Sequence, residues 1–402
     1  MPDGLIEVKK LTEQQSLIVQ SVEQLCSKYD DIYWRELDEK KAYPEEFMKS
    51  MEGLGLAALP VPEDYGGPSL GLREAYLVLE SINRHGGNSQ SLHGQYYLLF
   101  NLVRFGSSSL KEKYLPGIVQ GRMRLQSFAL TEPEAGSDTT RISCFATKKG
   151  GEYTINGHKI FISRVLQSDL LLLVARTTPY KEVNRKTEGI TLFLVDVRDA
   201  ISKKQLEARK IETVFNSQTY ELYIRDLHVP EDSIVGEEGK GFKCLLEVLN
   251  PERILISAEC VGDAKWFVNK CVNYANERVV FDKKIGSYQG VQFPIASVYS
   301  ELKAAEAISW QAACYYDEYS RSGKMDDKLM GSYANISKYL AAECSAKAAG
   351  IAMDVFGGYG MTKDMDVARK MLENRLYRVA PVSQNLALAY IAHNALGLPR
   401  SC

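Results

Sequence analysis

The segment VLNPERIL, residues 248–255, places a carboxylate and a guanidinium inside an apolar run. A glutamate with apolar neighbours is suited to act as a general base, because a water-poor pocket raises the pKa of a carboxyl group. The same letters also predict a helix start, with Asn250 as N-cap, Pro251 in the first position and Glu252 at the positive end of the dipole. The local sequence favours the helix start and leaves base catalysis by Glu252 open.

A second segment with chemical potential is SFALTEPEAGSD, residues 127–138. It predicts a strand that runs into a loop rich in small residues and main-chain donors, which suits an anionic or polar ligand. Phe128 and Leu130 would serve equally well as core residues of that strand. Arg278 is likewise compatible with a solvated surface charge, and Gly357-Gly358 with a helix C-cap.

Cysteines and histidines give no support to a metal site. The eight cysteines (26, 144, 244, 260, 271, 314, 344 and 402) form no CxxC motif or other paired spacing. Such scatter favours reduced thiols over a disulfide framework or a zinc site. The five histidines do not cluster, and His85 and His93 are expected in ordinary polar or capping roles. We predict no metal.

Length and charge narrow the class of protein. A chain of 402 residues exceeds one ordinary hydrophobic core, which favours two or three domains. Lys and Arg number 49 against 51 Asp and Glu, so nothing points to nucleic acid or an anionic membrane. No apolar run approaches the roughly 18 to 20 residues of a membrane-spanning helix, and MPDGLIEVKK has no signal-peptide character. We expect a soluble, cytoplasmic protein.

Helical periodicity dominates both ends of the chain. Near the start, Thr12 and Gln15 form a possible capping box ahead of an apolar helix face. Pro and Gly break the pattern at residues 61–72, and helical spacing then returns. From about Gly241 to the C-terminus almost every segment predicts helix.

The middle of the chain predicts β structure. EYTINGHKIFIS predicts a hairpin around Asn156-Gly157. DLLLLVART predicts a buried strand, and GITLFLVDV alternates as a half-buried strand does. The fold class is therefore α+β and multidomain, with an N-terminal α-helical domain (1–124), a middle β domain (125–239) and a C-terminal helical domain (240–402).

Several separated motifs share their order and spacing with one family. They are SFALTEPEAGSD, INGHKIFIS, ERVVFDKKIGSYQGVQF and DVFGGYGM, with VPEDYGG and KEKYLPGIVQG in the first domain. On these motifs the chain resembles the acyl-CoA dehydrogenase family from about Leu11 to Ala395. The resemblance implies that the middle domain is β-barrel-like and that the C-terminal domain is a four-helix bundle.

The resemblance also implies a reaction and its partners. Family members bind FAD, and each flavin is bound by two subunits of a homotetramer, a dimer of dimers. A carboxylate takes the α proton of an acyl-CoA thioester while hydride passes from the β carbon to the flavin, which gives a trans-2-enoyl-CoA. Electrons then usually leave through an electron-transfer flavoprotein. Neither nucleic-acid binding nor membrane insertion is expected.

Cofactor contacts follow from the same resemblance, position by position. FALT matches the segment that lies along the flavin ring. FIS stands where the family usually has Trp-Ile-Thr. Arg278, Val280 and Gln289 match positions that reach the FAD of the neighbouring subunit. The implied FAD contacts are Phe128, Leu130, Thr131, Ser137, Phe161, Ser163, Arg278, Val280, Gln289, Asp354, Gly357, Gly358, Ser383 and Asn385.

The usual catalytic position departs from the family pattern. In many members a glutamate follows the double glycine, in a Tyr-Glu-Gly-Thr stretch, but the ungapped alignment places Pro381 there. Proline cannot abstract a proton. A second branch, which includes the isovaleryl and long-chain enzymes, takes its glutamate from the first long helix of the third domain, just before an arginine. LNPER matches that place, so the resemblance implies Glu252 as the base, and Pro251 as a kink or break that aims it.

Pro381 has a further consequence for the substrate. In the common branch the N–H at this position helps to hold the thioester oxygen, and proline has none. The main chain at Val382 is the expected replacement donor. Asn250 and Arg253 are expected to line the thioester and CoA region, and Ser137 the CoA arm.

Other departures concern the cofactor. Asp354 stands where a glutamine often meets the neighbouring FAD diphosphate, so its carboxylate must be paired or turned away from the phosphates. Ser383 and Asn385 replace the usual Thr and Gln near the adenosine end and keep their hydrogen-bonding capacity.

The sequence thus predicts an FAD-dependent acyl-CoA dehydrogenase with Glu252 as the base. An acyl-CoA oxidase or an enoyl-CoA reductase on the same fold is the nearest alternative. Because of Pro381 and Asp354, a non-catalytic subunit of a hetero-oligomer is a further one. Nothing in the sequence identifies the acyl chain or the physiological electron acceptor.

Overall fold

The computed structural model describes residues 8–322 and 326–400, which form two compact units. The described residues of 1–40, 71–89 and 250–402 make up the first unit, and 41–70 and 90–249 make up the second. The long helix α8, Gly241–Glu277, contributes to both. The domain limits expected from the sequence remain predictions.

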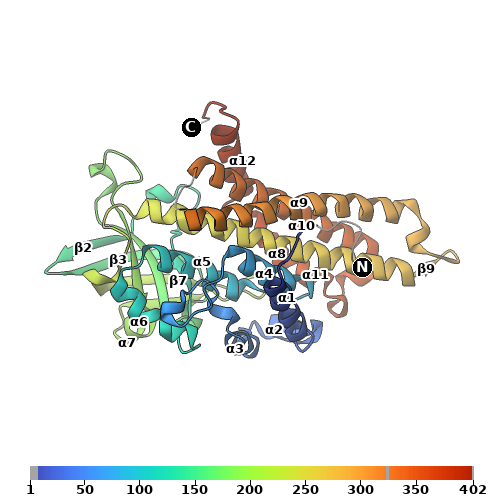
Figure 1. Ribbon diagram of the computed structural model, residues 1–402, viewed down its shortest axis with the longest axis horizontal. Coiled ribbons are helices and arrows are strands. Elements are labelled where there is room, and N and C mark those ends of the chain that lie inside the picture. Colours follow the sequence, from blue (N-terminus) through green and yellow to red (C-terminus); the bar gives the residue numbers. More distant parts are fainter. Residues whose placement is uncertain (1–7, 323–325, 401–402) are drawn as a thin grey trace. The chain divides into compact units, whose positions relative to one another are not determined.

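An eight-stranded sheet is the centre of the second unit, with the order β6-β7-β3-β2-β4-β5-β8. β3 runs antiparallel to both β2 and β7 (Figure 1), and β1 pairs in parallel with β4. The elements of this unit are β1 (Leu125–Ala129), β2 (Phe145–Lys149), β3 (Glu152–Ser163), β4 (Leu170–Arg176), β5 (Ile190–Asp196), β6 (Leu206–Lys210), β7 (Thr219–Pro230), β8 (Ile234–Val235), α3 (Glu45–Gly53), α5 (Gln90–Phe105), α6 (Ser108–Val119) and α7 (Val197–Ser202).

The hairpin predicted at Asn156-Gly157 is wrong, because both residues lie inside the single strand β3. The Asn156 side chain bonds across to Asp226 of β7, and the register shift next to Gly157 forms a bulge. The chain reverses instead at Gly150-Gly151, where φ is +60° and +84°. Two successive positive φ values are what a tight hairpin turn requires, and glycine adopts them without strain.

The buried strand predicted in DLLLLVART is confirmed, since every residue of β4 is buried. β5 is a strand as well, but the expected alternation is absent, because all of its residues except Asp196 are buried. Both strands therefore lie within the hydrophobic core, which includes Leu171, Leu173 and Phe193. Each fully buried leucine or phenylalanine stabilises the fold by about 1.5 to 3 kcal/mol relative to an exposed one.

The first unit is helical. Its main core lies among α8, α9 and α10 and includes Phe267, Leu302 and Ala348; α9 and α10 run beside each other (Figure 1). The capping box predicted at Thr12 and Gln15 is present at the start of α1. The elements are α1 (Glu13–Cys26), α2 (Asp31–Lys40), α4 (Leu72–Arg84), β9 (Val279–Val280), β10 (Lys283–Lys284), α9 (Gln289–Ser322), α10 (Asp327–Phe356), α11 (Val367–Arg375) and α12 (Gln384–Tyr390).

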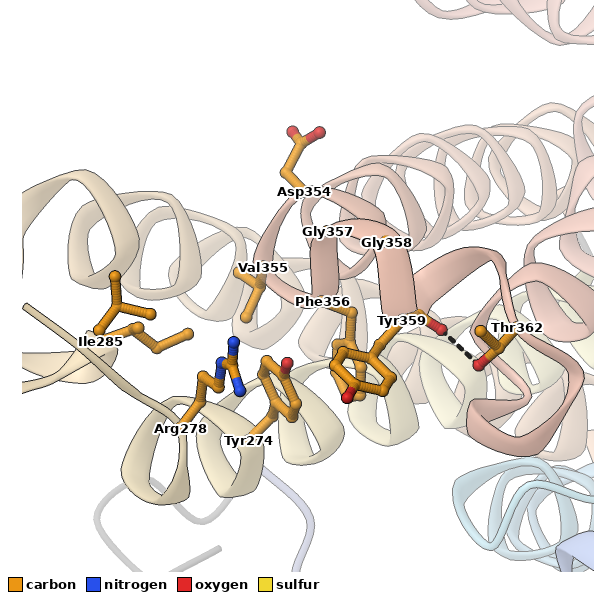
Figure 2. A pocket seen from close by; sticks show the side chains of 11 residues that line it. Tyr274, Arg278, Ile285, Asp354, Val355, Phe356, Gly357, Gly358, Tyr359 and Thr362 are labelled. Carbon is orange, nitrogen blue, oxygen red and sulfur yellow. Dashed lines mark hydrogen bonds between the residues drawn. The ribbon is translucent and has the colours of Figure 1, made fainter.

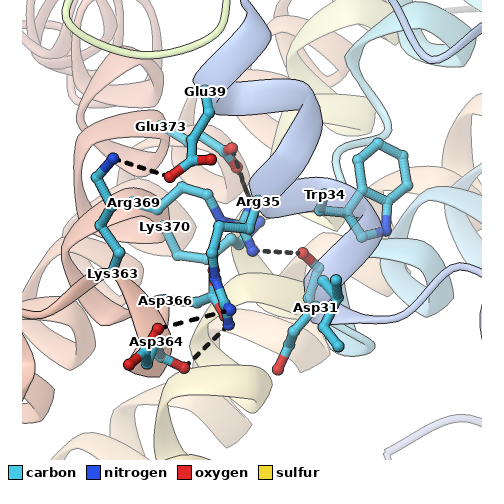
Figure 3. Close-up of polar contacts among 12 residues, drawn as sticks. Asp31, Trp34, Arg35, Glu39, Lys363, Asp364, Asp366, Arg369, Lys370 and Glu373 are labelled. Atoms are coloured by element: carbon cyan, nitrogen blue, oxygen red, sulfur yellow. Dashed lines mark hydrogen bonds and ion pairs between the residues drawn. The ribbon is translucent and has the colours of Figure 1, made fainter.

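Ion pairs connect α2 to the segment before α11 (Figure 3). Arg35 donates to the fully buried carboxylate of Asp366 at 2.6 Å, and Lys363 donates to Glu39 at 2.8 Å. The Arg35–Asp366 pair is shielded from solvent, so it contributes more than the exposed Lys363–Glu39 pair. Residues far apart in the chain are thereby joined within one unit.

The helix start predicted at Asn250 is wrong. α8 begins at Gly241 and continues through Pro251 as one helix, so neither the N-cap at Asn250 nor a break at Pro251 exists. The glycine and charged residues before Gly241 end the preceding segment, and the helix starts as soon as the apolar periodicity resumes. Glu252 is therefore an interior helix residue, and helix-terminus electrostatics do not explain it.

The described residues contain neither a disulfide nor a membrane-spanning helix. Seven cysteines within them are free, whereas Cys402 and the residues at the start of MPDGLIEVKK lie outside the described part. Across residues 8–322 and 326–400, no helix has both the length and the apolar character needed to cross a membrane.

Candidate active site

Two strands of the second unit bring the predicted flavin-ring residues together. The Thr131 carbonyl, just beyond β1, accepts a hydrogen bond from the Ile160 N–H of β3 at 3.0 Å. The next residue, Phe161, has a φ of +59° at a register shift in β3. This conformation is uncommon for a bulky residue, and it leaves the aromatic ring 62% exposed. An exposed ring on a strained strand is a feature of ligand sites.

The remaining residues of this group differ in exposure. Leu130 is buried, whereas Phe128 and Ser163 are half-buried. Phe128 meets Tyr97 of α5 edge to face, with ring centroids 6.2 Å apart. Ser137 lies in the exposed loop after β1, away from regular structure.

A buried ion pair that the sequence did not reveal fixes this segment. Lys159 of β3 is fully buried and donates to the Leu130 carbonyl and to Glu132, both at 2.9 Å. Glu132 also accepts hydrogen bonds from the N–H groups of Ser143 at 2.6 Å and Cys144 at 3.0 Å. Burial alone would raise the pKa of Glu132, but Lys159 and these N–H donors hold it below its usual range. Lys159 thus positions the segment with Phe128 and Thr131.

These residues fit the flavin ring of FAD. Phe161 offers an aromatic face to a flat ring, and Thr131 and Ser163 add hydroxyl groups beside it. The Leu130 carbonyl and the Thr131 carbonyl are already bonded within the protein, so the strand edge is rigid before any ligand arrives.

A pocket of about 470 Å³ lies in the first unit, at the end of α10 (Figure 2). Five of the predicted cofactor residues line it, namely Arg278, Val280, Asp354, Gly357 and Gly358. The lining residues are Tyr274, Arg278, Val280, Ile285, Asp354, Val355, Phe356, Gly357, Gly358, Tyr359 and Thr362.

The two glycines of this pocket are suited to the close approach of a phosphate. Gly357 has a φ of +56° and a ψ of −132°, a conformation that only glycine adopts readily. A Cβ atom on Gly357 or Gly358 would meet no atom within 4 Å, so their backbone is open to a ligand. Arg278 supplies the positive charge that a diphosphate needs. The Asp354 carboxylate points away from Arg278 (Figure 2), as a site for anions requires.

Three other predicted cofactor residues do not line this pocket. Gln289 is the exposed first residue of α9. Ser383 is the N-cap of α12, where its hydroxyl accepts from the Leu386 N–H at 3.3 Å, and Asn385 is exposed two residues further along. Their roles remain predictions.

Glu252 lies in a buried polar cluster in the middle of α8. Arg253, beside it, donates to the side-chain oxygens of Asn250 at 2.7 Å and Asn335 of α10 at 3.0 Å. Burial lowers the pKa of Arg253 to about 10, and the negative charge of Glu252 opposes that shift. Asn250, Glu252 and Arg253, three of the five residues predicted for the base and the substrate, are thus neighbours on α8, and Asn335 of α10 contacts Arg253; their roles remain predictions.

A second buried cation, also missed from the sequence, holds the chain next to Pro381. Lys338 of α10 donates to the Val382 carbonyl at 2.6 Å and to Gln384 at 2.9 Å. Burial lowers its pKa to about 8, and the neighbouring Arg253 cation acts in the same direction. A lone lysine inside a helical pattern carries no local signal, so only the fold could reveal this role.

A metal site would need several His, Cys, Asp or Glu side chains close together. Within the part of the chain that the structure describes, no three His, Cys, Asp or Glu side chains gather as metal ligands do.

Comparison with known families covers nearly the whole chain. Residues 12–122 match the acyl-CoA dehydrogenase N-terminal domain, 127–227 the middle domain and 239–396 the C-terminal domain. These three matches follow the order helical region, sheet and helical region seen here.

Individual relatives and structures agree. The acyl-CoA dehydrogenase FadE12 of Mycobacterium tuberculosis is 31% identical over 397 residues, which cover 97% of this chain and 98% of the relative. A 3-(aryl)acrylate reductase of Clostridium sporogenes is 30% identical, covering 96% and 99%. The structure of glutaryl-coenzyme A dehydrogenase with glutaryl-CoA has a TM-score of 0.88 at 28% identity and covers 98% of each chain.

Proposed function

Because the chain belongs to the acyl-CoA dehydrogenase family, whose members are FAD-dependent oxidoreductases, we propose that Glu252 is the base that takes the α proton of its acyl-CoA substrate. The observation that carries this proposal is the pairing of Pro381, where many members have glutamate, with a buried glutamate inside α8. A carboxylate buried in the middle of a helix has no capping role that would account for it. The product is a trans-2-enoyl-CoA.

The residues around Glu252 have separate tasks. Arg253, fixed by Asn250 and Asn335, places a positive charge beside the base, and a neighbouring positive charge favours the ionised form of a carboxylate. Asn250 and Arg253 then line the thioester and CoA region, with Ser137 on the CoA arm. Val382 offers its N–H to the thioester oxygen as negative charge develops there.

FAD, when bound, accepts the hydride that leaves the β carbon. Phe128, Leu130, Thr131, Phe161 and Ser163 would hold its ring. Its phosphates and adenosine would be held by the remaining predicted contacts, which are Ser137, Arg278, Val280, Gln289, Asp354, Gly357, Gly358, Ser383 and Asn385.

A homotetramer and an electron-transfer flavoprotein as electron acceptor complete the proposal. Support for a second copy comes from three consecutive exposed apolar residues, since Val279 is 54%, the pocket residue Val280 36% and Phe281 87% exposed. A contiguous exposed apolar patch is typical of a protein interface. Sedimentation of the pure protein at the monomer mass would overturn the tetramer.

The decisive experiment is anaerobic mixing of the flavin-loaded protein with a panel of acyl-CoAs. Glu252→Gln should slow flavin bleaching by about 100- to 10,000-fold, because the α proton then has no base. Glu318→Gln, at an exposed position of α9, is the matched control and should react as the wild type does. Near-normal bleaching by Glu252→Gln would disprove the assignment.

A reductase is the second candidate, and the relative from Clostridium sporogenes favours it. The same residues would then act in the opposite direction, with a protonated Glu252 returning the proton to the α carbon. Dithionite-reduced protein mixed with enoyl-CoAs separates the two. Rapid reoxidation together with a lack of bleaching by saturated acyl-CoAs would favour the reductase.

A further inference from the structure

The turn at residues 379–383 contains Pro381 and stands where many family members have the catalytic glutamate. Hydrogen bonds hold it to α10 at both of its ends. On one side, Arg378 donates to the Oε1 atom of Glu343 at 2.8 Å. On the other, Gln384 donates to the same oxygen at 2.8 Å and to the Tyr339 carbonyl at 3.2 Å. One carboxylate therefore ties the residues before and after the turn to a single helix.

Lys338 holds the middle of this turn. Its ammonium is buried and donates to the Val382 carbonyl at 2.6 Å, while Gln384 accepts a second bond at 2.9 Å. Both acceptors are neutral, in contrast to the carboxylate partners usual for a buried lysine. A buried cation on a main-chain carbonyl is costly in solvation, which suggests that the arrangement serves more than stability.

The bonds leave the N–H group of Val382 available. The ring of Pro381 restricts the backbone on the N-terminal side of Val382, and Lys338 holds the carbonyl on the other side. None of the hydrogen bonds among the described residues uses the Val382 N–H. This donor is thus held in direction, and none of the described residues uses it.

We propose that Lys338 is a positioning residue for the reaction: it fixes the Val382 N–H as the donor to the thioester oxygen, in place of the N–H lost at Pro381. The inference rests on the proposed function, because the donor matters only if an α proton is removed. Preorganised donors stabilise the charge that develops, and removal of one such donor typically costs about 100- to 1,000-fold in rate. A misdirected donor is expected to cost less, on the order of 10- to 100-fold.

A 3-thiaacyl-CoA, with sulfur in place of the β methylene, tests the inference. Glu252 can take its α proton, but no β hydride is available, so the anion accumulates beside the oxidised flavin and gives a long-wavelength absorbance band. Titration of that band against pH reports the pKa of the bound ligand. Lys338→Met should raise this pKa by about one unit, a tenfold weaker stabilisation of the anion, and Lys338→Arg should recover part of the loss.

The control is Lys347→Met on the same helix, which removes an exposed pair with Glu301 and should titrate as the wild type does. Glu343→Gln loosens the turn from its ends and should shift the pKa in the same direction by a smaller amount; it serves if Lys338→Met does not fold. A ligand pKa equal to the wild-type value in the folded Lys338 variant would overturn the inference. A full band in Glu252→Gln would instead overturn the proposed base.

Discussion

Two buried lysines, Lys159 in the sheet unit and Lys338 in the helical unit, are held in opposite ways. Lys159 in the sheet meets a carboxylate, Glu132, which in turn is held by main-chain donors. In the helical unit, Lys338 donates to a main-chain carbonyl and to a side-chain amide oxygen, which are both neutral. Lys159 is thus paired with a negative charge, whereas the hydrogen bonds of Lys338 go to neutral groups.

This difference indicates that Lys159 supports the structure, whereas Lys338 can act on a charge that develops during the reaction. A paired buried cation fixes geometry but offers little field to a ligand, because its partner cancels the charge. A cation held by neutral groups keeps its field, at the cost of a lowered pKa. Burial lowers the pKa of Lys338 to about 8. The surroundings of Lys338 are accordingly the ones suited to stabilising an enolate.

The largest expected effect comes from breaking the balanced pair. Lys159→Met leaves the Glu132 carboxylate buried and uncompensated, so it should lower the free energy of unfolding by about 3 to 5 kcal/mol and weaken flavin retention. Urea unfolding followed by circular dichroism measures the change. Adding Glu132→Gln removes the stranded charge while keeping an acceptor for Ser143, and the double variant should regain part of the stability. Equal loss in the single and double variants would contradict the balanced-pair description.

Removing the charge of Arg253 should affect the chemistry more than the fold. Arg253→Met takes away the cation that favours ionised Glu252, so the pKa of the base should rise. The acidic limb of kcat/KM against pH should therefore move upward by about one unit. Arg321→Met, at the exposed end of α9, is the matched control. An unmoved limb in Arg253→Met would mean that its charge does not reach the base.

The smallest effect concerns stability against pH. The pKa of Lys338 is about 8 in the folded protein and its ordinary value is 10.5, so between these values the unfolded chain binds a proton that the folded chain does not. Stability from this group therefore rises with pH. The difference in unfolding free energy between wild type and Lys338→Met should grow in favour of the wild type by on the order of 1 kcal/mol per pH unit between pH 8 and 10. A constant difference over that range would show that the lysine is not perturbed.

The elements were largely predictable, because they depend on local periodicity and capping. The capping box at Thr12 and the buried strand β4 followed from their own letters. The errors at Asn156-Gly157 and Asn250 share one cause: good turn and cap residues were overridden by their surroundings. Asn156 bonds across the sheet to Asp226, and α8 had already begun nine residues earlier, at Gly241.

The sequence alone determined the order of helical and β regions and, through the resemblance, the family and the departure at Pro381. These depend on composition and order along the chain. The roles of Lys159 and Lys338 were decided by tertiary structure. Lys159 bonds a carbonyl 29 residues away and Lys338 one 44 residues away. A single lysine has no periodicity or motif that indicates such a partner, so its environment is determined only once the strands and helices have packed.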